Sequence, residues 1–96
     1  MYKIQGVSKK TNKRFIEILS RFSEEEITTL KNELVSKPKG NPASHWKIKK
    51  VAPNVWQYDL PQGFRLEYTV DDALEIVFIL FTGSHDEAAV YLRSKK

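Results

Sequence analysis

The spacing of apolar residues changes in the middle of this chain, at residues 37–42 (KPKGNP). From residue 11 to this segment the apolar residues recur every three to four positions, and after it they alternate with polar ones. The first spacing is typical of an amphipathic helix and the second of a strand. Pro38, Gly40 and Pro42 are poor continuations of a helix. We therefore expect an α+β fold, with helices packed on one face of a small antiparallel sheet.

Two helices are predicted before the change, after a short strand within residues 1–7. The apolar residues of the first helix fall at i, i+3, i+4 and i+7; they are Phe15, Ile18, Leu19 and Phe22. Ser23 and Glu26 have the spacing of a capping box at the start of the second helix. The apolar positions of that helix are Ile27, Leu30 and Leu34. The two helices should form a hairpin.

Three strands are predicted after the change. Residues 56–60 and 64–70 alternate apolar and polar side chains on either side of the turn PQG. Residues 74–81 (LEIVFILF) are apolar at both parities, which is typical of a central strand covered on both faces. The tail HDEAAVYLRSKK is expected to add a short helix that packs through Val90 or Leu92. The predicted order is β-α-α-β-β-β with this C-terminal helix, in a single domain spanning residues 1–96.

Composition indicates a cytoplasmic protein. The chain has 96 residues and no cysteine, so it lacks disulfides and thiolate metal sites, which suits a reducing compartment. Its N-terminus has no apolar signal region. The longest apolar run, residues 76–81, is far shorter than the roughly 20 residues of a membrane helix. We therefore expect no membrane partner.

Charge is distributed unevenly along the chain. Residues 1–50 carry twelve Lys or Arg against five Asp or Glu, a net charge of +7, whereas residues 51–96 have a net charge of −3. The basic half favours a polyanion or an acidic protein as partner. The alternative is that its lysine-rich helices are simply well solvated.

Candidate catalytic residues lie in the strand half. The two histidines, His45 and His85, have no metal-binding spacing, so no metal or other cofactor is expected. Arg65, His85 and Tyr91 suit metal-free RNA cleavage, which needs proton transfer and stabilisation of phosphoryl charge. Each also has a structural alternative. Arg65 would pair across strands with Asp59 or Glu67, His85 would bond to Asp86 or Ser84, and Tyr91 would pack on the core.

The order of these residues resembles a known toxin family. Residues 55–93, VWQYDLPQGFRLEYTVDDALEIVFILFTGSHDEAAVYLR, resemble the C-terminal half of the RelE/ParE toxin superfamily. The resemblance implies a RelE-like fold and the toxin of a type II toxin–antitoxin system. It further implies a hydrolase that cuts ribosome-bound messenger RNA and is silenced by an acidic antitoxin. By position, Arg65, His85 and Tyr91 match the catalytic residues and Gly83 the glycine after the last strand.

The chain departs from the family pattern on one strand. Members that cleave RNA efficiently often carry two lysines where this chain has Gln57 and Asp59. Asp59 is then a candidate general base, as is His45. The candidate RNA-binding residues are Lys47, Lys49, Lys50 and Arg93. Two alternatives stay open: a ParE-like toxin that binds DNA gyrase, and a member that binds RNA or protein without catalysis.

Overall fold

Five strands and three helices make up the part of the chain that the computed structural model describes, residues 1–39 and 48–94. The strands are β1 (Lys3–Gly6), β2 (Ile48–Ala52), β3 (Val55–Asp59), β4 (Phe64–Asp71) and β5 (Ile76–Ser84). The helices are α1 (Lys9–Leu19), α2 (Glu24–Ser36) and α3 (His85–Ser94), and a short 3₁₀ turn, η1 (Pro61–Gly63), joins β3 to β4. The predicted α+β class and the predicted C-terminal helix are both confirmed.

The five strands form one sheet in the order β1-β5-β4-β3-β2. The strands β2 to β5 are antiparallel to their neighbours, as predicted, but β1 is parallel to β5. The helices carry the chain from β1 to β2 at the opposite edge, and the β2–β5 meander then brings β5 back beside β1. The sheet is therefore mixed rather than purely antiparallel.

The edge strand β2 was not predicted from the sequence. Its residues IKKVA include the exposed Lys49 and Lys50, so they show no clean alternation of apolar and polar side chains. Pairing with β3 defines the strand instead, with Lys49 opposite Gln57 and Lys50 opposite Trp56. An edge strand has a single neighbour and is not buried on both faces, which explains its weak apolar signal.

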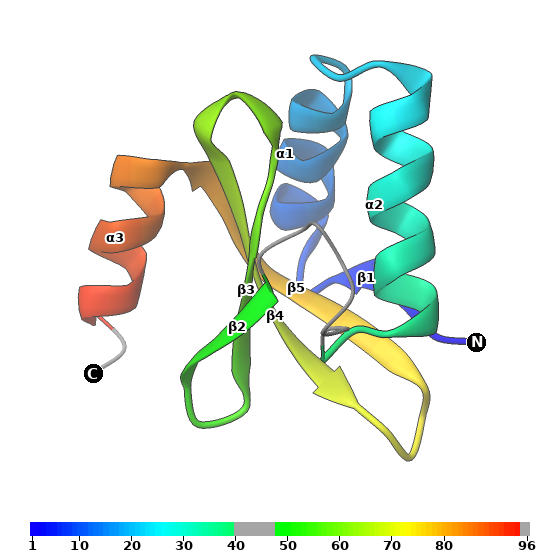
Figure 1. Cartoon of the computed structure of the whole chain (residues 1–96). Coiled ribbons are helices and arrows are strands. Elements are labelled where there is room, and N and C mark those ends of the chain that lie inside the picture. The colour runs from blue at the N-terminus through cyan, green and yellow to red at the C-terminus, as the bar shows by residue number, and fades with distance from the viewer. Residues whose placement is uncertain (40–47, 95–96) are drawn as a thin grey trace.

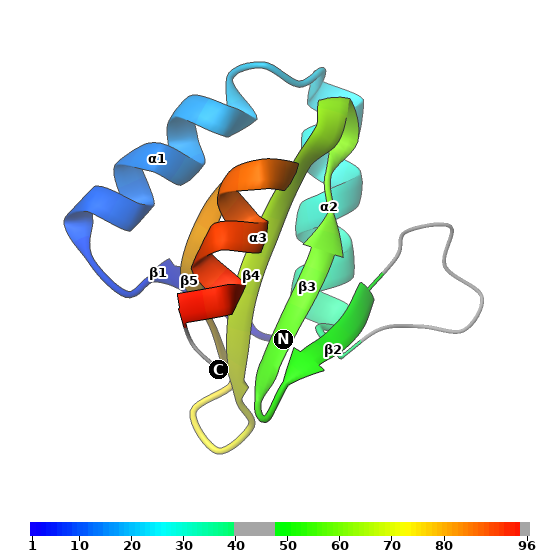
Figure 2. The same ribbon diagram turned by 90° about the vertical axis from the view of Figure 1, so that its left-hand side faces the viewer.

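The sheet separates two helical layers, with α1 and α2 on one face and α3 on the other (Figures 1 and 2). The side chains packed between the helical hairpin and the sheet are Phe15, Ile18, Phe22, Leu30, Leu34, Tyr58, Leu60, Leu66, Tyr68, Val70, Val77 and Ile79. The capping box predicted for α2 is confirmed. The Glu26 backbone N–H donates to Ser23 Oγ at 3.1 Å, and the Ser23 N–H donates to Glu26 Oε1 at 2.9 Å.

The helix α3 is held more shallowly than the hairpin helices. Ala88 is its one buried residue. Of the two residues named as possible packing contacts, Val90 is 57% exposed and Leu92 is half-buried. Gly83 permits the close approach of α3 to β5, because a Cβ at that position would lie 3.0 Å from Glu87 Oε1 and 3.1 Å from Phe81 Cζ. Of the helices described, none is long and apolar enough to cross a membrane.

Candidate active site

The polar sides of β3 and β4 lie on the sheet face that carries α3, which we call the α3 face. Leu66, Tyr68 and Val70 point into the core beneath the hairpin, so the alternating residues Arg65 and Glu67 point to the other face. The strand register places two rows of residues across this face. One row is Asp59, Arg65 and Gly83; the other is Lys49, Gln57, Glu67 and Phe81.

Arg65 pairs with Asp59 directly across the β3–β4 ladder. Its Nε lies 3.3 Å from Asp59 Oδ1, and the two side chains are 23% and 31% exposed. The cross-strand ion pair considered for Arg65 is therefore present. Within the described residues, the two terminal nitrogens of Arg65 make no ion pair or hydrogen bond. They stay available for the two-point contact that a guanidinium makes with a phosphate.

His85 is the first residue of α3 and lies two positions beyond Gly83, the β5 partner of Arg65. Its side chain is 60% exposed, with Nδ1 3.5 Å from Asp86 Oδ1. Ser84 and Glu87 fix the start of the helix, because the Glu87 N–H donates to Ser84 Oγ and the Ser84 N–H donates to Glu87 Oε1. The chain thus presents an exposed imidazole beside the Arg65 row.

Tyr91 stacks on Phe81 of β5. The ring centroids are 4.8 Å apart and the planes differ by 9°. Burial and the nearby Glu67 carboxylate both raise the pKa of the Tyr91 phenol above its usual range. Tyr91 therefore packs against the protein, as the structural alternative proposed. It packs on the Phe81 ring of the α3 face rather than on the core beneath the hairpin.

Glu67 is a buried carboxyl that the sequence pattern does not reveal. Its side chain is 0% exposed, and the facing Gln57 is 1% exposed. Both Glu67 carboxylate oxygens and Gln57 Oε1 lack a hydrogen-bond partner among the described residues. Burial, the largest cause, raises the pKa of Glu67 to about 8; Asp59 raises it further, while Arg65 and Lys49 oppose the shift. Burial of Glu67 therefore favours its protonated form in the folded protein.

Folding stability is expected to depend on pH through Glu67. Its pKa is 4.5 in an unfolded chain and about 8 in the folded protein, so between these values the folded protein holds a proton that the unfolded chain releases. The free energy of unfolding should fall as the pH rises through this window, by up to about 5 kcal/mol. The isosteric Glu67→Gln variant cannot ionise and should lack this fall. Urea unfolding of the wild-type and Glu67→Gln proteins at about pH 5 and about pH 8 tests this. If their free energies of unfolding differed by the same amount at both pH values, the prediction would be contradicted.

The candidate RNA-binding residues are spread over both faces. Lys49 belongs to the Glu67 row on the α3 face. Lys50 shares its row with Trp56, its Nζ lies 6.0 Å from the centre of the Trp56 ring, and it faces the other side of the sheet. Arg93 is exposed in the last turn of α3. His45 and Lys47 lie outside the described residues.

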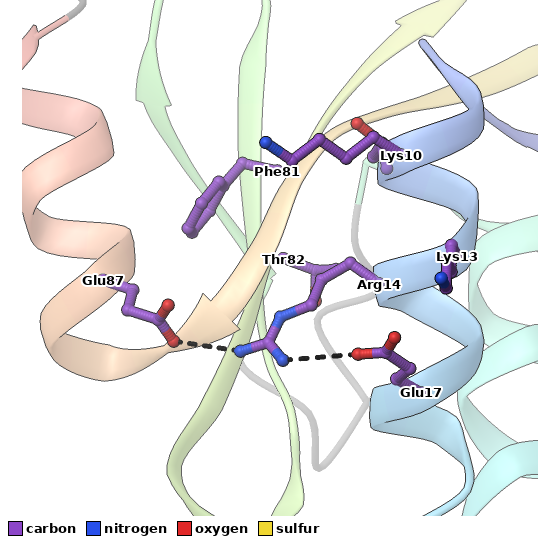
Figure 3. Close-up of a pocket in the computed structure, with 8 residues that line it drawn as sticks. Lys10, Lys13, Arg14, Glu17, Phe81, Thr82 and Glu87 are labelled. Atoms are coloured by element: carbon purple, nitrogen blue, oxygen red, sulfur yellow. Dashed lines mark hydrogen bonds and ion pairs between the residues drawn. The ribbon is translucent and has the colours of Figure 1, made fainter.

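A basic pocket of about 540 Å³ lies between α1, β5 and α3. Its lining residues are Lys10, Thr11, Lys13, Arg14, Glu17, Phe81, Thr82 and Glu87. Arg14 bridges the two helices, because its guanidinium contacts Glu87 at 3.2 Å and Glu17 at 3.7 Å (Figure 3). The Phe81 ring lies between α1 and α3 in the same view. Phe81 therefore belongs both to this pocket and to the stack with Tyr91.

Among the described residues, no three His, Cys, Asp or Glu side chains lie close enough together to hold a metal ion. The α3 face carries the Arg65 guanidinium, the Lys49 ammonium, the carboxyl groups of Asp59 and Glu67 and the stacked rings of Phe81 and Tyr91, with the His85 imidazole at the start of α3.

Comparison with solved structures identifies the fold. A metal-bound toxin from Helicobacter pylori superposes with a TM-score of 0.68 at 20% identity, covering 91% of this chain and 98% of that one. A mutant of the Escherichia coli toxin RelE in the free state gives 0.57 at 18% identity, covering 94% and 90%. The archaeal RelE–RelB complex from Pyrococcus horikoshii gives 0.57 at 11% identity, covering 88% and 94%.

Sequence comparison adds no closer relative: no protein-family model matches the chain, and no curated protein does. The chain has the fold of RelE-type toxins. The resemblance drawn from residues 55–93 is thus confirmed at the level of the fold.

Proposed function

We propose that this chain is the toxin of a type II toxin–antitoxin system and cleaves ribosome-bound messenger RNA in the cytoplasm. The RelE-type fold supports the assignment to toxins. The observation that carries the proposed activity is the β4–β5 register. It sets Arg65 opposite Gly83, two residues before His85. This supports proposed roles for Arg65 in phosphate binding and for His85 in proton transfer at one end of the sheet.

The proposed reaction is an internal phosphoryl transfer. The ribose 2′-oxygen forms a bond to the adjacent phosphorus, and the bond from phosphorus to the 5′-oxygen breaks. A base takes the 2′-hydroxyl proton, and His85 as general acid gives a proton to the departing 5′-oxygen. Arg65 stabilises the charge that develops on the phosphoryl oxygens. Asp59, beside Arg65, and His45 are the two candidate bases.

An acidic antitoxin is the proposed protein partner. One solved structure with this fold is a RelE–RelB complex, and another is a mutant E. coli RelE in complex with a RelBc antitoxin peptide. The net charge of +7 on residues 1–50 suits an acidic partner. We propose that such a protein wraps the domain and covers Arg65 or His85, which would silence the toxin.

Induction of the protein in growing cells tests the function. New messenger RNA ends should appear within translated regions shortly after induction, and co-expression of the reading frame next to its gene should suppress them. A His85→Ala protein made to the same level is the matched control and should leave the messages intact. Intact messages with the wild-type protein would contradict the proposal, and failure of the neighbouring frame to protect them would contradict the antitoxin.

Binding of RNA without cleavage is the second candidate function. The observation in its favour is the ion pair between Asp59 and Arg65, because a carboxylate 3.3 Å from the guanidinium offsets part of the charge that a phosphate would meet. Ribosome binding by the wild-type protein without new RNA ends would favour this candidate.

A further inference from the structure

The α3 face contains buried hydrogen-bond acceptors without donors. Both carboxylate oxygens of Glu67 and the side-chain oxygen of Gln57 lack a partner among the described residues. The two residues face each other across β3 and β4 and are 0% and 1% exposed. Buried acceptors are nearly always satisfied in folded proteins, because leaving them unpaired opposes folding. When Glu67 is ionised, these acceptors have no donor among the described residues, and a ligand that brings its own N–H groups would satisfy them.

Stacked aromatic rings lie beside these acceptors. Phe81 is the β5 partner of Glu67, and Tyr91 of α3 stacks on it at 4.8 Å. Phe81 also lines the pocket that holds Lys10 and Lys13 (Figure 3). A flat ring arriving through this pocket would meet Phe81 first. Helix α3 buries a single residue, Ala88.

Basic residues outnumber acidic ones around the acceptors. Arg65 lies two positions from Glu67 on the same face, Lys49 lies in the Glu67 row, and Lys10, Lys13 and Arg14 line the adjacent pocket. The acidic residues there are Asp59 beside Arg65 and Glu17 and Glu87 in the pocket. The basic residues attract phosphate and repel an arginine side chain, which otherwise also combines a flat surface with paired N–H donors. The surroundings therefore favour a nucleobase of an RNA chain over a basic peptide.

Guanine is the base whose donors match a carboxylate. Its N1–H and N2–H groups lie side by side on one edge and can both donate to the two oxygens of an ionised Glu67. Adenine and cytosine each offer a single amino group there, next to an acceptor nitrogen that a carboxylate would repel. Uracil offers a single N–H between two carbonyl oxygens.

We propose that Glu67 recognises a guanine of the RNA substrate whose ring enters between Phe81 and Tyr91. This inference rests on the proposed function and specifies its substrate. The base takes the place of the direct Phe81–Tyr91 stack and itself stacks on both rings. RNA-binding proteins hold unstacked bases on aromatic side chains in the same way. Gln57 supplies a third acceptor beside Glu67.

Uncleavable RNA measures this recognition apart from catalysis. The probes are trinucleotides with 2′-O-methyl riboses, which lack the attacking hydroxyl, and with guanine, inosine or adenine between two uridines. The wild-type protein should bind the guanine probe roughly 10-fold more tightly than the inosine probe, which lacks the N2 amino group. Glu67→Gln should remove this preference. Glu25→Gln, the same substitution at an exposed position of α2, should keep it.

The pH dependence of binding gives a second readout. The charged and titratable groups that act on Glu67 are Arg65 of β4, Asp59 of β3, Lys49 of β2 and Tyr91 of α3. Because Glu67 must lose its proton to accept both guanine donors and its pKa is about 8, affinity for the guanine probe should rise between pH 6 and pH 8. The affinity should rise by at most tenfold per pH unit, and the Glu67→Gln protein should show no such rise.

Four outcomes decide the inference. Equal affinity of the wild-type protein for the guanine and inosine probes would overturn it, and this comparison needs no variant to fold. A guanine preference that persists in Glu67→Gln would also overturn it. Glu67-dependent binding of an arginine-containing tripeptide, without binding of the RNA probes, would assign the site to a protein partner instead. Messenger RNA cleavage without guanine preference would remove this inference and leave the proposed function intact.

Discussion

Arg65→Ala is expected to lower the single-turnover rate of messenger RNA cleavage by about 100-fold or more, as loss of a charge-stabilising donor does in other enzymes. The guanidinium is positioned for this role by the β4 register and keeps its two terminal nitrogens clear of the ion pair that Nε makes with Asp59. Arg65→Lys should recover little activity, because one ammonium group cannot reproduce a planar two-point contact with a phosphate.

The Arg65 measurement needs a control for charge and a control for folding. Arg21→Ala also removes one arginine, but from an exposed position after α1 where the guanidinium packs on Phe64. This variant should cleave at close to the wild-type rate. Thermal melts of each protein identify a loss of rate that results from unfolding. Full activity of a well-folded Arg65→Ala protein would mean that the ion pair with Asp59 is the whole role of Arg65.

Most of the fold was predictable because its elements have strong local signals. The capping box at Ser23 and the apolar spacing that includes Leu30 and Leu34 act within a few residues of one another, so the sequence alone locates α2. The edge strand β2 was not predictable in this way, since its pairing with β3 defines it rather than its own composition. The parallel placement of β1 beside β5 is likewise set by the path of the whole chain.

The candidate site was predictable only in its residue types. Arg65 and His85 stood out because their chemistry suits RNA cleavage, and the predicted cross-strand partner Asp59 is present. Glu67 did not stand out, because alternation places it on the polar side of β4, where a carboxylate is normally solvated. Its burial depends on α3 returning across that face, which is a tertiary contact without a local signal. The one available clue was a central strand with apolar residues at both parities, which implies that something covers the second face.

His85→Ala is expected to lower the cleavage rate by about 100-fold to 10,000-fold, the usual contribution of a positioned acid or base. The imidazole is 60% exposed at the first position of α3, so an RNA phosphate can reach it without displacing protein atoms. Asp86→Ala is the matched control, because it removes the carboxylate 3.5 Å from Nδ1 while retaining the imidazole. That variant should keep most of the rate if His85 itself transfers the proton.

The pH profile separates proton transfer from a purely structural role of His85. The wild-type rate should depend on pH through proton transfer at His85, and the His85→Ala rate should lack that dependence. A large loss of rate with an unchanged pH profile would mean that His85 positions the RNA, because proton transfer is the role that ties the rate to ionisation of the imidazole. If Arg65→Ala and His85→Ala both cleave at the wild-type rate and melt normally, the catalytic centre lies elsewhere. Residues on the α3 face would then serve binding, and the RelE-type fold would stand without the proposed chemistry.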